Sequence, residues 1–263
     1  IVFIWLQLYV WKSTSDVTYR ITRLLPLPVA SVDGVSVPYS RYLLYHRSTM
    51  AFADGQSVAA DKLLFQQKQA MDNAIKDAYA QKIANERNLV VTDEQVETLI
   101  ESKRKESNMT EHAYEGVVRD KLHWSMDELR QAFRAALLNQ AVAFSVDQQA
   151  SDLVKKIEAE VREGKALDQI AEAHKDVVQY MSNVTVPKDN SDGGLSAAAA
   201  RLKPEVISNA TKTLQGDGYY FILLRKSDDQ TITYDYIRVP LTMFSQQFEA
   251  LKKDNKVQYY IKM

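Results

Sequence analysis

One long run of helically spaced apolar residues dominates the pattern along the chain. Between Lys62 and Leu89 there is neither Gly nor Pro, and apolar side chains recur every three or four residues. This spacing predicts one amphipathic helix of about 28 residues, roughly 40 Å long. A helix of this length cannot bury its apolar stripe alone, so it needs partner helices. The stripe consists of Leu64, Met71, Ala74, Ile75, Ala78, Tyr79 and Ile83.

Capping patterns predict the partner helices. Thr92–Gln95 and Ser125–Glu128 each carry a capping box, in which a hydroxyl and a later Gln or Glu bond the first backbone N–H groups of a helix. Thr110 is predicted to begin a further helix between them. Before the long helix, residues 29–38 alternate around Asp33-Gly34, which predicts a short strand with a tight turn.

Residues that break helices divide the chain into two parts. Pro is absent between Tyr39 and Val186, and this block contains only three Gly. A helical domain requires such a block, whereas Pro and β-branched residues return after it. We therefore expect an α+β fold, in which a mainly helical domain joins a small α/β module and the character of the chain changes near residues 147–177.

The first residues form a short apolar segment. The chain begins with IVFIWLQLYV, without an initial Met, and continues with Lys12 and a polar stretch. A membrane-spanning helix needs about 20 apolar residues, so residues 1–12 are predicted to be the last part of a transmembrane anchor. A shortened signal-peptide core and a buried or interfacial segment remain open as alternatives. Trp5, Tyr9 and Trp11 gather toward the polar end, as in the aromatic belt of a membrane surface.

Composition narrows the chemistry. The formal net charge of −1 provides no positive surface for nucleic acid, and the absence of Cys excludes disulfides and thiolate chemistry. The histidines lie far apart and show no metal-ligand spacing with a carboxylate, so we expect neither a metal nor a cofactor. These histidines are His46, His112, His123 and His174.

Three segments between Val29 and Val146 follow one another in a characteristic order. They are VASVDG at residues 29–34, ANERNLVVTDEQV at 84–96, and MTEHAYEGVVRDKLHWSMDELRQAFRAALL at 109–138. In this order they resemble the N-terminal chaperone domain of SurA/PrsA-type proteins. The resemblance implies a helical chaperone domain over residues 13–146 that binds unfolded or extended polypeptide clients.

Three later segments resemble a second module of the same family. They are GKALDQIA at residues 164–171, DGGL at 192–195 and GYYFILL at 218–224. They are similar to elements of the parvulin (PpiC) fold, whose members catalyse cis/trans isomerisation of X–Pro peptide bonds. The resemblance implies a parvulin-like module over residues 147–228 and a C-terminal strand and helix, residues 229–263, that return to the chaperone domain.

The parvulin resemblance also implies positions for an active site. The family places a His on the first strand, an Asp or Cys after a helix, and a second His in the closing strand. The first strand falls near Ala143–Val146, which contains no His, the Asp or Cys position falls on Asp176 or Val177, and the closing position falls on Tyr220. Tyr220 and Asp176 are therefore catalytic candidates by position only, and we expect a degenerate site.

The two resemblances, together with the apolar N-terminal segment, imply a membrane-anchored, extracytoplasmic folding factor of a bacterial cell envelope. It would bind unfolded polypeptide clients, contact the membrane through its N-terminal segment, and carry a parvulin-like module that is weak or inactive. Two alternatives stay open: an active peptidyl-prolyl isomerase, and a non-catalytic scaffold for one envelope partner. No Gly-x-Ser-x-Gly, Walker-type or His-Glu-x-x-His motif supports hydrolase, nucleotide or metalloprotease chemistry.

Overall fold

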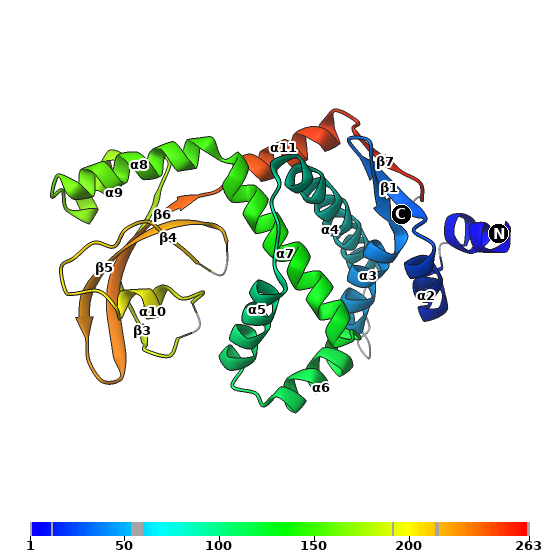
Figure 1. Cartoon of the computed structure of the whole chain (residues 1–263), viewed down its shortest axis with the longest axis horizontal. Coiled ribbons are helices and arrows are strands. Elements are labelled where there is room, and N and C mark those ends of the chain that lie inside the picture. The colour runs from blue at the N-terminus through cyan, green and yellow to red at the C-terminus, as the bar shows by residue number, and fades with distance from the viewer. Residues whose placement is uncertain (1, 12, 54–59, 191, 214–215, 262–263) are drawn as a thin grey trace. The chain divides into compact units, whose positions relative to one another are not determined.

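The fold is α+β, as predicted, and consists of helices with two small antiparallel sheets. A computed structural model describes residues 2–11, 13–53, 60–190, 192–213 and 216–261 (Figure 1). The chain divides into two compact units, one formed by Ile1–Val142 with Ser245–Met263 and the other by Ala143–Phe244.

The first unit is mainly helical, and α7 and α11 each contribute residues to both units. Its elements are α1 (Val2–Trp5), the π-helical turn η1 (Leu6–Val10), α2 (Asp16–Leu24), β1 (Pro28–Val32), β2 (Val35–Pro38), α3 (Tyr39–Ala53), α4 (Ala60–Arg87), α5 (Asp93–Glu106), α6 (Glu111–Leu122), α7 (Met126–Val146), α11 (Met243–Lys253) and β7 (Val257–Tyr259).

The core of the helical unit follows the predicted apolar stripe of α4. Met71, Ala74 and Ile75 are fully buried, and the core cluster that contains them includes side chains of α3, α5 and α7. Only the first residue of the stripe, Leu64, is exposed. The long helix begins and ends within two residues of its predicted bounds. The apolar spacing determines where the helix lies, whereas its exact ends depend on the residues before and after it.

The predicted turn at Asp33-Gly34 is confirmed, and it joins β1 and β2 into an antiparallel hairpin. Both residues have positive φ, 45° and 81°, as a tight type I′-like turn requires. On its other edge β1 pairs with β7, with Val32 opposite Val257 and Ala30 opposite Tyr259. The sheet order is therefore β2-β1-β7, with β1 in the centre.

The predicted helix starts are confirmed by their hydrogen bonds. Thr92 and Gln95 form a complete capping box at the start of α5, and Thr110 accepts a bond at the start of α6. At α7 the amide of Ser125 donates to Glu128 (2.6 Å), and the amide of Glu128 donates to the Ser125 hydroxyl (3.2 Å). These boxes are local in sequence, which is why the pattern alone could locate them.

The second unit contains a four-stranded antiparallel sheet of order β3-β6-β5-β4. Side chains of α8 and α9 pack on one face of the sheet with Phe221 and Ile237, and side chains of α10 pack on the other with Ile222 and Tyr234. Its elements are α8 (Gln148–Arg162), α9 (Leu167–Ala173), β3 (Gln179–Pro187), α10 (Leu195–Ala199), β4 (Thr211–Lys212), β5 (Gly218–Ser227) and β6 (Thr231–Pro240).

Two predicted elements of this region differ in the structure. Ala143–Val146 is the last turn of α7 and not a strand, because the helical stripe of Leu138 and buried Val142 continues into it. The strand at 231–240, which we grouped with the C-terminal return, is β6 and pairs on both sides with β3 and β5. Residues from Ser245 onward belong to the helical unit.

A buried carboxylate explains how the chain turns from α7 into α8. Asp147 Oδ1 accepts the amide of Ala150 (3.0 Å) and caps α8, while Oδ2 accepts the amides of Thr242 (2.7 Å) and Met243 (3.0 Å). One side chain thus satisfies three backbone donors from two segments that lie far apart in sequence.

The N-terminal segment packs in part against the helical unit. Leu8 is buried, its carbonyl accepts the Tyr39 hydroxyl (3.2 Å), and the Tyr9 hydroxyl donates to the Pro28 carbonyl (2.7 Å). Ile1 and Lys12, which belong to the predicted anchor, lie outside the described residues. Among the helices of the described part, none has the length and apolar character to cross a bilayer.

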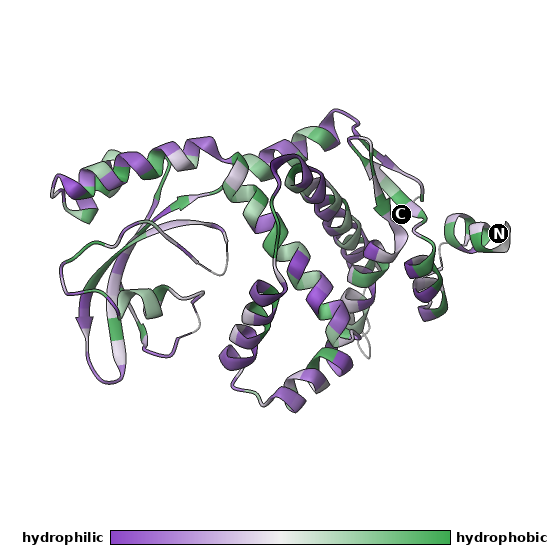
Figure 2. Ribbon diagram, viewed as in Figure 1, coloured by the Kyte–Doolittle hydropathy of each residue, from purple (hydrophilic) through white to green (hydrophobic). Residues whose placement is uncertain are grey.

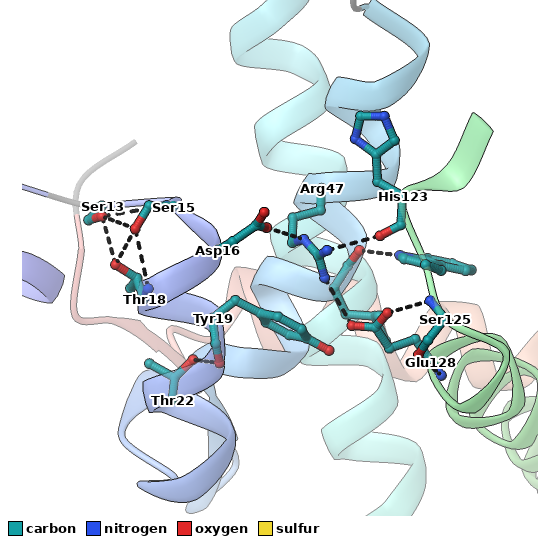
Figure 3. A network of polar contacts seen from close by, with 12 residues as sticks. Ser13, Ser15, Asp16, Thr18, Tyr19, Thr22, Arg47, His123, Ser125 and Glu128 are labelled. Atoms are coloured by element: carbon teal, nitrogen blue, oxygen red, sulfur yellow. Dashed lines mark hydrogen bonds and ion pairs between the residues drawn. The ribbon is translucent and has the colours of Figure 1, made fainter. Parts of the chain in front are cut away.

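A polar network centred on Arg47 holds α2 on the helical unit (Figure 3). Its guanidinium donates to Glu128 Oε1 (2.9 Å) and to the His123 carbonyl (3.0 Å), and lies 4.5 Å from the centre of the Tyr19 ring. Asp16 Oδ1 is 3.1 Å from its Nε. Arg47 therefore links α2, α3 and the start of α7.

Glu128 is ionised within this network. Burial alone would raise its pKa, but the Ser125 amide, the Tyr19 hydroxyl and Arg47 together outweigh burial and lower the pKa below the usual 4.5. Because the folded-state pKa is lowered, Glu128 stabilises the fold above pH 4.5, and this stabilisation is lost as the pH falls through the folded pKa.

We predict that Glu128→Gln lowers the free energy of unfolding by about 2 kcal/mol at neutral pH, because one charge-assisted pair is lost. The difference from the parent should shrink as the pH falls below 4.5. Urea unfolding followed by tryptophan fluorescence at several pH values measures it, and Glu94→Gln, an exposed acidic residue of α5, is the control. A difference that stayed constant down to pH 3 would contradict the role of the Glu128 charge.

Candidate functional site

Tyr220, the candidate at the closing position, lies in the core of the second unit. It sits in β5 opposite Arg238 of β6 and is only 3% exposed. Its hydroxyl donates to the carboxylate of Asp217, with oxygen distances of 2.9 and 3.0 Å. Burial raises the pKa of Tyr220 to about 12, and the hydrogen bond to Asp217 adds to that rise.

The surroundings of Tyr220 are those of a packed face and not of an open pocket. Its ring lies 5.5 Å from that of Tyr236, and Leu195 of α10 belongs to the same core cluster. Asp217, which accepts the Tyr220 hydroxyl, is also ion-paired with Arg238. The phenol therefore stays protonated and engaged at neutral pH.

Asp176, the second candidate, is exposed in the turn between α9 and β3. It lines an open cavity of about 640 Å³ together with His174, Val177 and the start of α8. The His174 ring is hydrogen-bonded to Glu160, because its Nε2 lies 2.9 Å from Glu160 Oε2.

The structure does not bring Tyr220 and Asp176 together. Side chains alternate along β5, so Phe221 and Leu223 lie on the face covered by α8, while Tyr220 lies on the opposite face. The cavity with Asp176 is lined by residues of α8 and by Val178 and Val239, which belong to the α8 side. The two candidates therefore lie on opposite faces of the sheet.

Sequence reasoning missed Asp217 and Arg238, the polar partners of Tyr220. The hairpin turn between β5 and β6 carried a signal, because residues opposite each other can be counted from such a turn. A bulge between Leu224 and Lys226 shifts the register by one residue, however, so plain counting would have selected Val239 in place of Arg238.

Besides Asp147, the second unit contains another buried acidic residue, Asp235, which accepts hydrogen bonds from three other residues. Asp235 is 1% exposed and accepts two bonds from Arg225, through Nε (2.9 Å) and Nη2 (2.7 Å). It also accepts the Tyr180 hydroxyl (3.2 Å) and the Asn183 amide (2.7 Å). The carboxylate accepts four hydrogen bonds, three at Oδ2 and one at Oδ1, and thereby links β3, β5 and β6.

In the helical unit, an open groove of about 550 Å³ lies between α5, α6 and α7. Its apolar lining is Ile100, Tyr114 and Met126, one side chain from each helix. The rim is charged with both signs, and its arginines are ion-paired, Arg104 with Glu101 (2.6 Å) and Arg130 with Glu97 (2.6 Å). Figure 2 shows α5 mainly hydrophilic, apart from the residues that pack inward.

Comparisons with known proteins identify no family for the chain. No family model and no curated protein matches it. Among solved structures it is similar to a chain from work on the virulence factor PEB4 and the periplasmic protein Cj1289, described as SurA-like chaperones of Campylobacter jejuni. The identity is 13%, the match covers 88% of this chain and 98% of that one, and the TM-score is 0.31.

In the part of the chain that the structure describes, no three His, Asp or Glu side chains gather as a group that could hold a metal ion.

We predict that substitutions of Tyr220 and Asp176 differ in their effect on the stability of the second unit and not in an effect on catalysis. Tyr220→Phe should lower the stability of the second unit by about 1–2 kcal/mol, because Asp217 and Arg238 lose a charge-assisted partner. Asp176→Ala should change stability by no more than about 0.5 kcal/mol, as expected for an exposed residue. Hydrogen exchange of peptides from β5 and β6, measured by mass spectrometry, reports on this unit. Equal effects of both substitutions would contradict the assignment of Tyr220 to the core.

Proposed function

We propose that this protein is an extracytoplasmic folding factor of SurA/PrsA type that binds unfolded, extended polypeptide segments. The observation that carries the proposal is the groove between α5, α6 and α7, with its apolar lining and charged rim. Unfolded chains of different sequence share exposed apolar side chains, which such a lining accepts without fixed geometry.

The chemistry of the groove favours breadth over selectivity. Met126 is flexible and polarizable and adapts to side chains of different shape, while Tyr114 combines an apolar ring with a hydroxyl. The rim carries Glu111 and Glu115 as well as the two arginines that are ion-paired with Glu101 and Glu97, so it offers carboxylates to the basic side chains of a client. A binder of many clients needs this adaptability, whereas a binder of one partner gains from a rigid, matched pocket.

In this proposal the second unit is a parvulin-like module with little or no isomerase activity. Catalysis would have to lower a barrier of about 20 kcal/mol by stabilising a twisted amide in an accessible pocket. The burial of Tyr220, its bond to Asp217 and the distance in the fold between it and Asp176 all argue against such a pocket. The module would then have a role other than catalysis.

The proposal also places the protein at a bacterial membrane, anchored through residues 1–12. Trp5 and Trp11 support this, because both side chains are more than half exposed. Tryptophan side chains are usually buried in soluble proteins but are common at the surface of a membrane. The helical unit would face the extracytoplasmic side, where unfolded clients arrive.

We predict that Tyr114→Ala/Met126→Ala weakens binding of an extended, fluorescently labelled peptide about tenfold, because two contact side chains are removed. Suppression of client aggregation, followed by light scattering, should fall in parallel. Val90→Ala/Val206→Ala removes two exposed apolar side chains that do not line the groove and should leave both readouts unchanged. Failure of the parent chain to bind any extended peptide would sink the proposal. Capture of one envelope protein without general client binding would favour the dedicated scaffold.

A second prediction concerns catalysis. On a panel of X–Pro peptides, the rate of cis/trans exchange measured by NMR should equal the uncatalysed rate, with the parent chain and with Tyr220→Phe or Asp176→Ala. A clear acceleration that either substitution abolished would restore the alternative of an active isomerase.

A further inference from the structure

Helix α2 is packed with its polar face inward. Thr18, Tyr19 and Thr22 are buried, whereas Val17 and Leu24 are 63% and 83% exposed. Val17, Ile21 and Leu24 follow the i, i+4, i+7 pattern and lie within about 60° of one another around the helix axis. Amphipathic helices of globular proteins normally bury this stripe, so its outward direction requires an explanation.

Contacts with Arg47 of α3 hold the buried face of α2 inward (Figure 3). The Tyr19 ring lies beneath the Arg47 guanidinium, and Asp16 is ion-paired with it. Bonds within α2 and its N-cap satisfy the buried hydroxyls: Thr22 donates to the Tyr19 carbonyl (3.0 Å), and the Thr18 hydroxyl lies 2.9 Å from that of Ser15. Rotation of α2 to bury Leu24 would separate Tyr19 from Arg47 and expose the aromatic ring.

Within the described part of the chain, the two ends of the stripe, Val17 and Leu24, are exposed, and Ile21 between them is half-buried. None of Val17, Ile21 and Leu24 belongs to the core cluster or to the apolar side chains packed against it there. The exposed apolar surface continues through Leu25, and the preceding segment adds exposed Trp5, Val10 and Trp11. Exposed apolar side chains therefore occur in both α2 and the N-terminal segment, which are neighbours in the sequence.

The charges beside the stripe are positive. Arg20 and Arg23 are exposed, and the single acidic residue of the helix, Asp16, is ion-paired with Arg47. The chain as a whole has a net charge of −1, so any attraction to an anionic surface must come from this local arrangement. An apolar stripe, flanking arginines and neighbouring tryptophans are the combination that an anionic bilayer surface accommodates.

We propose that α2 lies flat in the interface of an anionic lipid bilayer. Val17, Ile21, Leu24 and Leu25 enter the boundary between headgroups and acyl chains, and Arg20 and Arg23 bind lipid phosphates. This inference deepens the membrane location in the proposed function and is independent of client binding. It gives the helical unit a second contact with the membrane, and so fixes which side of that unit faces the lipid.

The test is binding of the full chain to vesicles of phosphatidylcholine alone and of phosphatidylcholine with phosphatidylglycerol. Each arginine near an anionic surface contributes about fivefold in affinity, so Arg20→Gln/Arg23→Gln should bind the anionic vesicles about 30-fold more weakly. Leu24→Ser/Leu25→Ser should weaken binding to both vesicle types. Arg201→Gln/Lys203→Gln, an exposed basic pair of the second unit, should match the parent.

Three results would overturn the proposal. One is parent-like affinity of both α2 variants while Trp5→Ser/Trp11→Ser releases the protein from vesicles, because the N-terminal segment would then account for all membrane contact. Another is loss of a dimer in the α2 variants without any change on vesicles, because a second copy would then cover the stripe. The third is equal weakening by the control pair. Client binding without lipid is measured on the same variants and should be unchanged, so its failure would count against the folding function alone.

Discussion

The pairing of β7 with β1 is the constraint on which the helical unit depends. The Asp33 amide donates to the Lys256 carbonyl (2.9 Å) and the Tyr260 amide to the Val29 carbonyl (3.0 Å), so the strand after α11 is fixed beside the first hairpin. This pairing places Phe248 and Ile261 in the same core as α4. Because residues 1–142 and 245–263 share one core, we expect the helical unit to be stable only when both stretches are present.

Three carboxylates of the second unit show how ionisable groups can serve a fold through the hydrogen bonds that they accept within it. Asp147 and Asp235 each accept several hydrogen bonds, and Asp217 holds both Tyr220 and Arg238. A buried carboxylate is tolerated when its lone pairs are satisfied, and a satisfied carboxylate is a poor acid or base. Positional resemblance to a catalytic family therefore says little until the partners of each group are known.

How far the sequence could predict this structure depended on how local each interaction is. The long helix and the capping boxes follow from neighbouring residues, and they were predicted within two residues of their bounds. The bond from Arg47 to Glu128 joins residues 81 positions apart, and no pattern along the chain indicates it. The inward polar face of α2 follows from that bond, because Tyr19 packs beneath Arg47.

The same dependence on locality limits what the positions of Tyr220 and Asp176 along the chain say about where the two side chains lie in the fold. Motifs locate residues along the chain, whereas the face of a sheet that a residue occupies depends on strand pairing and on bulges. One bulge in β5 was enough to change the partner of Tyr220. The predicted strand at Ala143–Val146 was wrong because the helical spacing of the preceding residues continued through it.

The insertion of residues 143–244 between the two stretches of the helical unit also affects the order of folding during synthesis. The inserted unit is contiguous, and its β5–β6 hairpin closes within a few residues, so it can fold as soon as it leaves the ribosome. The helical unit, although it comes first in the chain, cannot complete its sheet until β7 has been made. During this interval the core faces that α11 and β7 complete stay exposed, so the unit whose chain is made first is the last to close its core.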